Sequence, residues 1–349
     1  MSKQNEGNQK GSVTGPSYVS WVDMARGGAI TLVVLGHTWR GLYSAELIPP
    51  GFYRVVDNGI YAFHMPLFFI ISGFFYFSHL PKLDLLHRGL AVTRRLLIPL
   101  VIWTYIFLFL RVLFSDFTNA KPDFNSLLVL PFPGILHFWF LWALWLIQIG
   151  LLLVAALLPR GRRGDFLLVI SAVLVTALWA NGPILPFQSI LGDVYRYGIY
   201  FVFGAFAFRL LAPAVVKRRG LIFASVIFLM LLGITLVPDI SRFWATILAI
   251  GLSVSFLFGI KGLSVYRLPG LRALQWIGAY SFSIYMMHTI FSVSARALLL
   301  AGGVTLLPLH LFVGIFAGIL CPIFASLLLA RVGGGRFLGL QDRPPPSAS

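Results

Sequence analysis

The sequence has few charged residues and almost no cysteine. Asp, Glu, Lys and Arg make up 11% of its 349 residues, whereas an ordinary soluble domain contains about 25%. The single cysteine, Cys321, excludes an internal disulfide framework. We find no sequence repeat, no heptad array and no glycine-rich phosphate-binding loop. These absences argue against a soluble enzyme, a disulfide-stabilised secreted domain and a P-loop nucleotide site.

Apolar residues dominate instead, at 58% of the chain and a mean hydropathy of +0.89. A membrane-spanning helix needs about 20 consecutive apolar residues, and helices satisfy their own backbone hydrogen bonds in lipid. The sequence therefore predicts an all-α, polytopic membrane protein with about ten transmembrane helices in one domain, residues 21–331. The polar flanks, 1–20 and 332–349, are expected to be disordered and cytoplasmic. The predicted spans are 22–40, 58–77, 96–114, 138–158, 166–180, 195–212, 221–237, 243–260, 273–293 and 307–331.

Basic residues outnumber acidic residues by 27 to 11, which gives a formal net charge of +16. With a cytoplasmic N-terminus, the predicted spans place 20 of the 27 Lys and Arg residues in cytoplasmic segments and 7 outside. Lys and Arg favour the cytoplasmic loops of membrane proteins. The basic excess therefore indicates topology and contact with anionic lipid, and we expect no nucleic-acid partner. Both termini are predicted to be cytoplasmic.

The first span carries two ionisable residues in "ARGGAITLVVLGHTW", residues 25–39. Eleven residues separate Arg26 from His37, so both side chains lie on nearly the same helix face, roughly 16 Å apart along the axis. Arg26 alone is also consistent with a side chain that extends to lipid phosphates. An imidazole deep within the membrane raises the free energy of the folded protein unless it faces a hydrogen-bond partner or a cavity. His37 is therefore either a hydrogen-bonded structural residue or part of a functional site.

Further basic groups surround the second span, "NGIYAFHMPLFFIISGFFYF". His64 lies at a depth similar to that of His37, beside Pro66, which removes a backbone donor and loosens the helix. Arg94 and Arg95 stand where the third span begins. They are either ordinary cytoplasmic anchors or, with Arg26, a basic mouth for a phosphorylated ligand, because arginine binds phosphate through a planar fork.

The ninth span contains "GAYSFSIYMMHTIF", in which Ser281, Tyr285 and His288 follow at i, i+4 and i+7 and so share one face. His288 lies towards the outer side, so we expect three histidines from three helices in the outer half of the bundle. No carboxylate lies near them within the spans, so we expect no metal site. The tryptophans of "LHFWFLWALW", which include Trp139, form either an interfacial aromatic belt or a platform for sugar rings.

These motifs resemble the acyltransferase-3 family of integral membrane acyltransferases, which modify carbohydrates. The resemblance covers residues 20–331 and rests on Arg-x10-His in the first span, "FHMPLFFIISGFF", "RRLLIPLVIW", "HFWFLWAL" and "SFSIYMMH". The "FHMPLFF" form is most similar to the branch with fucose and polysaccharide O-acetyltransferases. The family pattern falls on Arg26, His37, His64, Arg94 with Arg95, and Ser283 to His288.

The resemblance implies an acyl-CoA donor, most often acetyl-CoA, a carbohydrate acceptor and a bacterial inner membrane. The donor phosphates would meet Arg26, Arg94 and Arg95, and the thioester would lie near His37. His37 would act as a general base or form a covalent acyl intermediate.

His64 and His288 would orient His37, stabilise the oxyanion or dock the acceptor. Trp139, Ser283 and Tyr285 are candidates for contact with the carbohydrate. Two other functions remain open: a transporter of a glycan or lipid-linked sugar, which fits helices interrupted by glycine and proline, and a non-catalytic subunit of a polysaccharide assembly complex.

Overall fold

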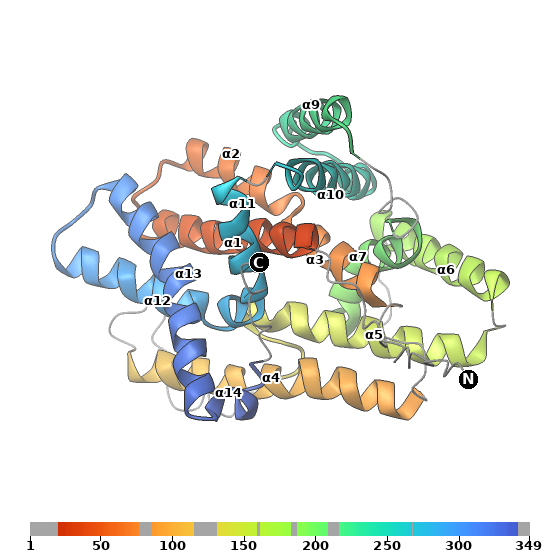
Figure 1. Cartoon of the computed structure of the whole chain (residues 1–349), viewed down its shortest axis with the longest axis horizontal. Helices are drawn as coiled ribbons and strands as arrows, with labels where there is room; N and C mark the ends of the chain where they lie inside the picture. Colours follow the sequence, from red (N-terminus) through yellow and green to blue (C-terminus); the bar gives the residue numbers. More distant parts are fainter. Residues whose placement is uncertain are drawn as a thin grey trace, which may run out of the picture.

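A computed structural model of the chain describes residues 20–76, 85–114, 131–158, 161–182, 187–208, 216–266 and 268–340. Within these ranges the protein consists of helices and short connections, without a strand (Figure 1). The predicted all-α class is therefore confirmed. The predicted disordered residues 1–19 and 341–349 lie outside the described part.

The chain forms thirteen α-helical segments, the 3-10 turn η3 and the π-helical turn η4 within the described residues. They are α1 (Ser20–Ser44), α2 (Pro50–Tyr61), α3 (His64–Tyr76), α4 (Leu85–Leu113), η3 (Leu136–Phe138), α5 (Trp139–Leu157), α6 (Arg162–Ala180), α7 (Gln188–Phe203), η4 (Gly204–Phe208), α9 (Arg218–Ile234), α10 (Arg242–Leu263), α11 (Pro269–Ala279), α12 (Ser281–Ala301), α13 (Leu307–Arg331) and α14 (Gly334–Phe337).

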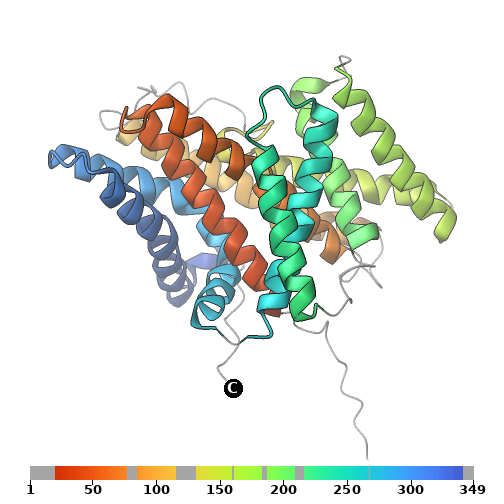
Figure 2. The same cartoon turned by 90° about the horizontal axis from the view of Figure 1, so that it is seen from above.

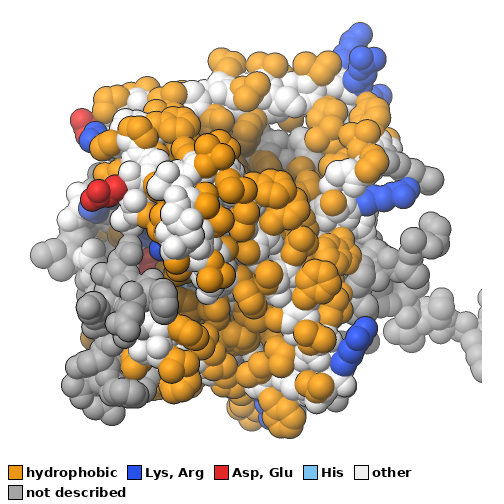
Figure 3. Space-filling model, turned by 90° about the vertical axis from the view of Figure 1, so that its left-hand side faces the viewer, with side chains coloured by type: hydrophobic (Ala, Val, Ile, Leu, Met, Phe, Trp, Pro, Cys, Tyr) orange, Lys and Arg blue, Asp and Glu red, His pale blue; other side chains and the backbone are white. Residues whose placement is uncertain are grey.

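Large hydrophobic side chains cover much of the outside of this bundle, as Figure 3 shows for one face, where Lys and Arg lie near the margins. Leu157, Leu298 and Phe316 are among the exposed side chains. Seven helices in the described residues are long and apolar enough to cross a membrane. These helices are Pro50–Tyr76, Leu85–Leu113, Leu136–Val154, Arg163–Ala180, Arg242–Leu263, Ser281–Ala301 and Leu307–Arg331. The chain is therefore a multi-pass membrane protein.

Two of the ten predicted spans are interrupted in the structure. The second breaks at Ala62 and Phe63, between α2 and α3. Pro66 has no N–H for the Ala62 carbonyl, and His64 Nδ1 instead lies 2.7 Å from the Ile60 carbonyl oxygen. The ninth breaks at Tyr280, whose φ of −101° and ψ of 13° end α11 before α12 begins. The ninth predicted span is therefore two helices, whereas the turn in the second lies within a stretch, Pro50–Tyr76, that is still long and apolar enough to cross a membrane.

Helix α1 occupies the centre of the bundle, with α12 and α13 on one side and α10 on the other (Figure 2). It has 25 residues, about half of them buried, yet it is not one of the seven helices that are long and apolar enough to cross a membrane. Its neighbours shield its polar groups from lipid. Glycines allow the closest approach: a Cβ on Gly27 would lie 1.8 Å from the Leu274 carbonyl oxygen, and one on Gly278 would lie 1.8 Å from that of Asp23.

Helix α13 runs antiparallel to α1. Gly314 packs on Thr38, and Gly318, one turn further along α13, packs on Val34, one turn earlier in α1. Arg331, where α13 ends, therefore lies on the same side of the bundle as the start of α1. That this side faces the cytoplasm stays a prediction.

The segment after α13 differs from the expected disordered tail at 332–349. Residues 334–337 form the short helix α14, and the Leu338 carbonyl accepts a hydrogen bond of 2.9 Å from Trp103 Nε1 on α4. Leu340 is buried in the main core. The chain therefore packs against α4 as far as Leu340, with Gly339 beside Pro99, within the segment that the sequence analysis expects to be disordered.

Candidate active site

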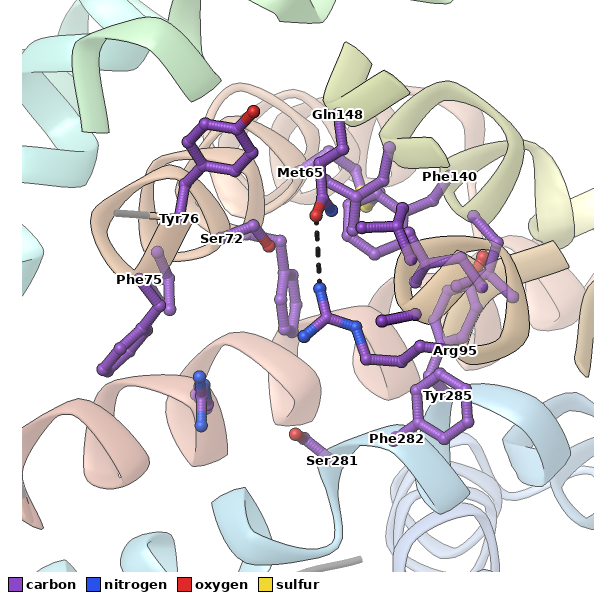
Figure 4. Close-up of a pocket in the computed structure, with 18 of the residues that line it drawn as sticks. Met65, Ser72, Phe75, Tyr76, Arg95, Phe140, Gln148, Ser281, Phe282 and Tyr285 are labelled. Atoms are coloured by element: carbon purple, nitrogen blue, oxygen red, sulfur yellow. Dashed lines mark hydrogen bonds between the residues drawn. The ribbon is translucent and has the colours of Figure 1, made fainter. Parts of the chain in front are cut away.

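A cavity of about 600 Å³ lies among α1, α3, α4, α5 and the start of α12 (Figure 4). Its two ends differ in chemistry. Arginine side chains line one end, and apolar and aromatic side chains from all five helices line the rest. The arginines are Arg26, Arg88, Arg94 and Arg95, and the rest includes Val33, Met65, Phe68, Phe140, Leu144 and Tyr285.

Helix α4 supplies three of the four arginines. Arg88 and Arg95 are seven residues apart, close to two full turns, so both side chains project from the same helix face. Arg95 Nη2 donates a hydrogen bond of 3.3 Å to Gln148 Oε1 of α5, across the cavity shown in Figure 4. The predicted residues Arg94 and Arg95 therefore do meet at one site. Arg88, which the sequence analysis did not select, joins them.

Arg26 lies at the same end but is already paired. Its Nη1 is 2.9 Å from Asp23 Oδ1, and its guanidinium lies over the Phe75 ring at 4.8 Å. Arg26 therefore faces protein and the cavity wall rather than lipid. Asp23 compensates one positive charge, so the four arginines and this one carboxylate leave a net positive end.

Three imidazoles meet beyond the other end of the cavity. The His37 ring centroid lies 5.0 Å from that of His288 and 6.1 Å from that of His137, and the last two are 5.2 Å apart. They come from α1, α12 and η3. His137 and His288 are buried, and His37 is half-buried. Of the three histidines that the sequence analysis groups together, the structure brings His37 and His288 into contact, and His137 takes the third place instead of His64.

The hydrogen bonds around these rings determine which nitrogen atoms remain available. His288 Nδ1 lies 3.0 Å from the Ile284 carbonyl oxygen and 2.9 Å from that of Tyr285. A carbonyl only accepts, so Nδ1 carries the proton and Nε2 of neutral His288 keeps a lone pair. Both His288 Nε2 and His137 Nε2 are buried without a hydrogen-bond partner in the described structure.

The cavity ends about one helical turn below each of the three imidazoles. Val33 precedes His37 by four residues, and Tyr285 precedes His288 by three. Val33 and Tyr285 line the cavity, whereas the two histidines do not. Phe140, three residues after His137, lines it too, because α5 runs in the opposite direction. One turn rises about 5 Å, so the three rings form a layer directly above the cavity.

Tyr285 connects two of the elements that carry this layer. Its hydroxyl donates a hydrogen bond to the backbone carbonyl of His137. This bond ties η3 to α12 just above the cavity. Ser281 and Tyr285 both line the cavity, and His288 follows on the same face, as the spacing in the sequence predicts.

His64, the other predicted histidine, occupies a different environment. It is buried and lies edge-on to Tyr61 with ring centroids 4.5 Å apart, while its Nδ1 lies beside the Ile60 carbonyl. Tyr61 in turn packs on Gly36 of α1. His64 therefore lies near the C-terminal half of α1, and no ring contact joins it to His37, His137 or His288 in the described structure.

Two predicted carbohydrate contacts lie away from the cavity lining. Trp139 packs on Tyr197 with ring centroids 5.0 Å apart. Ser283 is fully buried, and its neighbours Ser281 and Phe282 line the cavity instead. Among the described residues, no group of three His, Cys, Asp or Glu side chains has a geometry that could hold a metal ion.

An apolar helical bundle with a basic-ended cavity below a layer of imidazoles defines a multi-pass membrane protein with a polar site among its helices. The chain belongs to the Acyl_transf_3 family, whose sequence model is described as an acyltransferase domain and matches residues 19–329. The chain is therefore a member of an acyltransferase family, and the resemblance seen in its motifs is confirmed.

Two curated relatives carry the name nodulation protein NolL. The relative from Mesorhizobium japonicum is 28% identical over 185 residues, which cover 51% of this chain and 46% of the relative. The relative from Sinorhizobium fredii is 28% identical over 191 residues, which cover 51% of this chain and 47% of the relative. The matched region thus spans about half the length of these relatives. No solved structure matches the chain.

Proposed function

We propose that the protein is an O-acyltransferase that moves an acyl group from cytoplasmic acyl-CoA, most often acetyl-CoA, to a hydroxyl of a carbohydrate. The carbohydrate is part of a polysaccharide, a lipo-oligosaccharide or a lipid-linked glycan at a bacterial inner membrane. The observation that supports this proposal is that one cavity is lined at one end by a cluster of arginines and ends, on the other side, about one helical turn from a layer of histidines.

The donor is proposed from the shape and charge of the cavity. Phosphates of CoA suit Arg88, Arg94 and Arg95, because guanidinium groups bind phosphate oxygens through paired N–H donors. The cavity of about 600 Å³ lies within the usual range for small-molecule sites. Arg26 and His37 are about 16 Å apart along α1, a span of the same order as a pantetheine arm. A donor bound this way carries its thioester up to the imidazole layer.

His37 is the imidazole that we assign to the acyl carbon. It continues the face of α1 on which Arg26 and Val33 line the cavity. His37 acts there either as a general base for the acceptor hydroxyl or as a nucleophile that carries the acyl group. The second route lets CoA stay on the inner side while the acyl group reaches an acceptor on the outer side.

The carbohydrate acceptor is proposed from the family. The motifs around His64 resemble those of fucose and polysaccharide O-acetyltransferases, and two relatives are named as nodulation proteins. A transporter remains the alternative function, but transport of a sugar gives no reason for a basic cavity that leads to histidines.

The test is thiol release from acetyl-CoA by purified protein in detergent, with and without extracted surface glycans. We expect release that glycans stimulate and that His37→Ala lowers by about 100-fold or more. The matched control is His310→Ala, because His310 is a buried histidine on α13 whose Nε2 contacts the Val304 carbonyl, outside the imidazole layer. Glycan movement across vesicles without thiol release would instead support transport.

A further inference from the structure

One face of α1 stays accessible beyond the imidazole layer. His37 is half-buried but does not line the cavity that holds the arginines. Arg40, Gly41 and Ser44, which follow His37 by three, four and seven residues, are also exposed or half-buried, and this spacing puts all four on one helix face. We call these four residues the outer face of α1, because the charge pattern predicts that this end of the helix lies on the outer side of the membrane.

Arg40 on this face is already neutralised by α2. Its Nε and Nη2 donate hydrogen bonds of 2.7 and 2.9 Å to the two carboxylate oxygens of Asp57. Its guanidinium also lies over the Tyr61 ring, 3.3 Å from the centroid. Arg40 and Asp57 therefore give the outer face a polar flank without net charge.

Arg296 approaches the outer face from α12. A Cβ on Gly41 would lie 1.8 Å from Arg296 Nη1, so the guanidinium occupies the space that the missing side chain leaves. Gly41 lies about 6 Å beyond His37 along α1, whereas Arg296 lies about 12 Å beyond His288 along α12. Because His37 and His288 are in contact, the Arg296 side chain must extend back into the bundle.

This direction is informative because an arginine near a membrane surface normally extends towards that surface, where it meets water and lipid phosphates. Helix α12 ends at Ala301, only five residues beyond Arg296. Arg296 instead leans towards the N-terminus of its helix, as helical side chains do, and places its charge one turn beyond His37. Its position is therefore that of a group which faces the outer approach to His37.

Arg296 carries this charge without a counterion among the described residues. No described carboxylate forms an ion pair with it, and no hydrogen bond joins it to another described residue. The residue is half-buried. A cation held partly away from water raises the free energy of the folded protein unless an anion or a hydrogen-bond acceptor faces it. An anionic group of a bound substrate would supply the missing partner.

We propose that Arg296 binds an anionic group, a phosphate or a carboxylate, on the carbohydrate acceptor and thereby selects acidic glycans. A guanidinium suits either group, because its paired N–H donors match two oxygen atoms. The inference rests on the proposed function, in which the donor occupies the cavity and the acceptor hydroxyl meets His37. With about 6 Å between His37 and Gly41 along α1, the anionic group lies on the modified sugar or on its neighbour.

The probe is surface glycan from cells that make the protein. Mild alkali removes existing esters, and anion exchange separates the glycans into a neutral and an acidic fraction. Purified full-length protein then transfers radiolabel from acetyl-CoA to each fraction. We expect wild type to label the acidic fraction at least about tenfold more efficiently, because a hydrogen bond to a charged group is worth that factor or more.

Substitutions at Arg296 separate its charge from its hydrogen bonds. Arg296→Gln keeps N–H donors but loses the charge, and it should lower kcat/KM for the acidic fraction by about tenfold or more while the KM for acetyl-CoA stays unchanged. Arg296→Lys keeps the charge and should retain most of the activity. Arg242→Gln is the matched control, since Arg242 is a basic residue of the predicted outer side that contacts the Trp179 carbonyl instead.

Gly41→Ala displaces the guanidinium without removing any charge. The three atoms nearest to the added Cβ all belong to the Arg296 guanidinium, which can move, so the variant should keep the wild-type melting temperature in detergent. We expect it to label the acidic fraction less than wild type does. Wild-type labelling by Gly41→Ala would show that the position of the guanidinium does not matter, and it would overturn the inference.

Chemical treatment of the acidic fraction identifies the anionic group. Aqueous hydrofluoric acid removes phosphate, and carbodiimide-assisted reduction removes carboxylates. Loss of labelling after one of these treatments supports the inference and names the group. Equal labelling of the neutral and acidic fractions by wild type, equal labelling of the acidic fraction by wild type and Arg296→Gln, or labelling that survives both treatments would overturn it.

Failure of the proposed function gives a different result, because wild type would then release no thiol and label neither fraction. Binding without acetyl-CoA decides the role of Arg296 in that case. The acidic fraction should bind wild-type protein in phosphatidylcholine nanodiscs about tenfold more tightly than it binds Arg296→Gln. Equal affinities, as expected if Arg296 contacts only lipid phosphate, would reject the anion site whether or not the protein is catalytic.

Discussion

Arg95 extends from α4 across the cavity to Gln148 of α5, at the end where we place the donor phosphates. The charge of this side chain is expected to act mainly on donor binding. A hydrogen bond to a charged group contributes about 1.5–3 kcal/mol, which corresponds to a tenfold or larger change in affinity.

We therefore expect Arg95→Gln to raise the KM for acetyl-CoA by about tenfold or more, with a small change in kcat, in thiol-release assays. Arg111→Gln is the matched control, since Arg111 stands near the other end of the same helix. Equal KM values for the two variants would show that the basic end does not bind the donor.

Tyr285 supports the imidazole layer through its bond to the His137 carbonyl. Tyr285→Phe removes this donor and leaves a buried carbonyl unsatisfied, at a cost of about 1–3 kcal/mol. Because η3 then loses its anchor, we expect kcat for acceptor modification to fall about tenfold while the KM for acetyl-CoA changes little. A KM increase without a kcat change would instead place Tyr285 at the donor.

The sequence predicts some of these residues and not others, for identifiable reasons. Helical spacing predicts that Arg26 and His37 share one face of α1 and that Tyr285 and His288 share one face of α12, because the two residues of each pair lie in the same helix. His137 was present in the quoted motif "LHFWFLWALW", but it lies in the short η3 turn, and only tertiary packing brings it to α1 and α12. Arg88 is one of the 20 basic residues that the predicted topology places in cytoplasmic segments, and charge alone does not distinguish a residue that anchors a helix at the membrane surface from one that binds a ligand.

At the scale of the elements, the ten apolar stretches predict where helices form, and each contains helix in the part of it that the structure describes. Their interruptions are harder to predict. The break after α2 depends on how His64 and Pro66 use neighbouring backbone groups, and the break at Tyr280 permits the close crossing of α11 over α1. Hydropathy averages over a window and does not detect either event.

The crossing of α1 and α11 depends on small residues, and a pair of variants on α11 measures this. A Cβ at Gly278 would lie 1.8 Å from the Asp23 carbonyl oxygen, whereas one at Gly270 would have no heavy atom within 4 Å. We expect Gly278→Ala to lower stability by about 1–3 kcal/mol or more and Gly270→Ala to leave it unchanged or slightly higher. Thermal unfolding in detergent measures both, and equal melting temperatures would contradict the close crossing.

At the scale of the whole molecule, the antiparallel packing of α13 on α1 puts the start of α1 and Arg331 on one side of the bundle. The distribution of Lys and Arg predicts that this side is cytoplasmic. The helix packing shows that the start of α1 and the end of α13 lie on the same side of the bundle. The charge pattern predicts which side of the membrane that is.

Reporter fusions test this orientation. Alkaline phosphatase inserted at Gly303, between α12 and α13, should be active because the predicted topology places it outside. The same reporter at the C-terminus should be inactive, and a green fluorescent protein there should fluoresce. The reverse pattern would place the basic end of the cavity outside the cell, where no acyl-CoA is present.

The most direct test of the account is an experimental structure of the protein in nanodiscs with a non-hydrolysable acetyl-CoA analogue. We predict that the nucleotide phosphates of the analogue contact Arg88, Arg94 and Arg95. Its pantetheine arm should run through the cavity past Met65 and Tyr285 and place the acetyl carbon beside His37. Density that binds elsewhere, or an acetyl group separated from His37 by packed side chains, would contradict it.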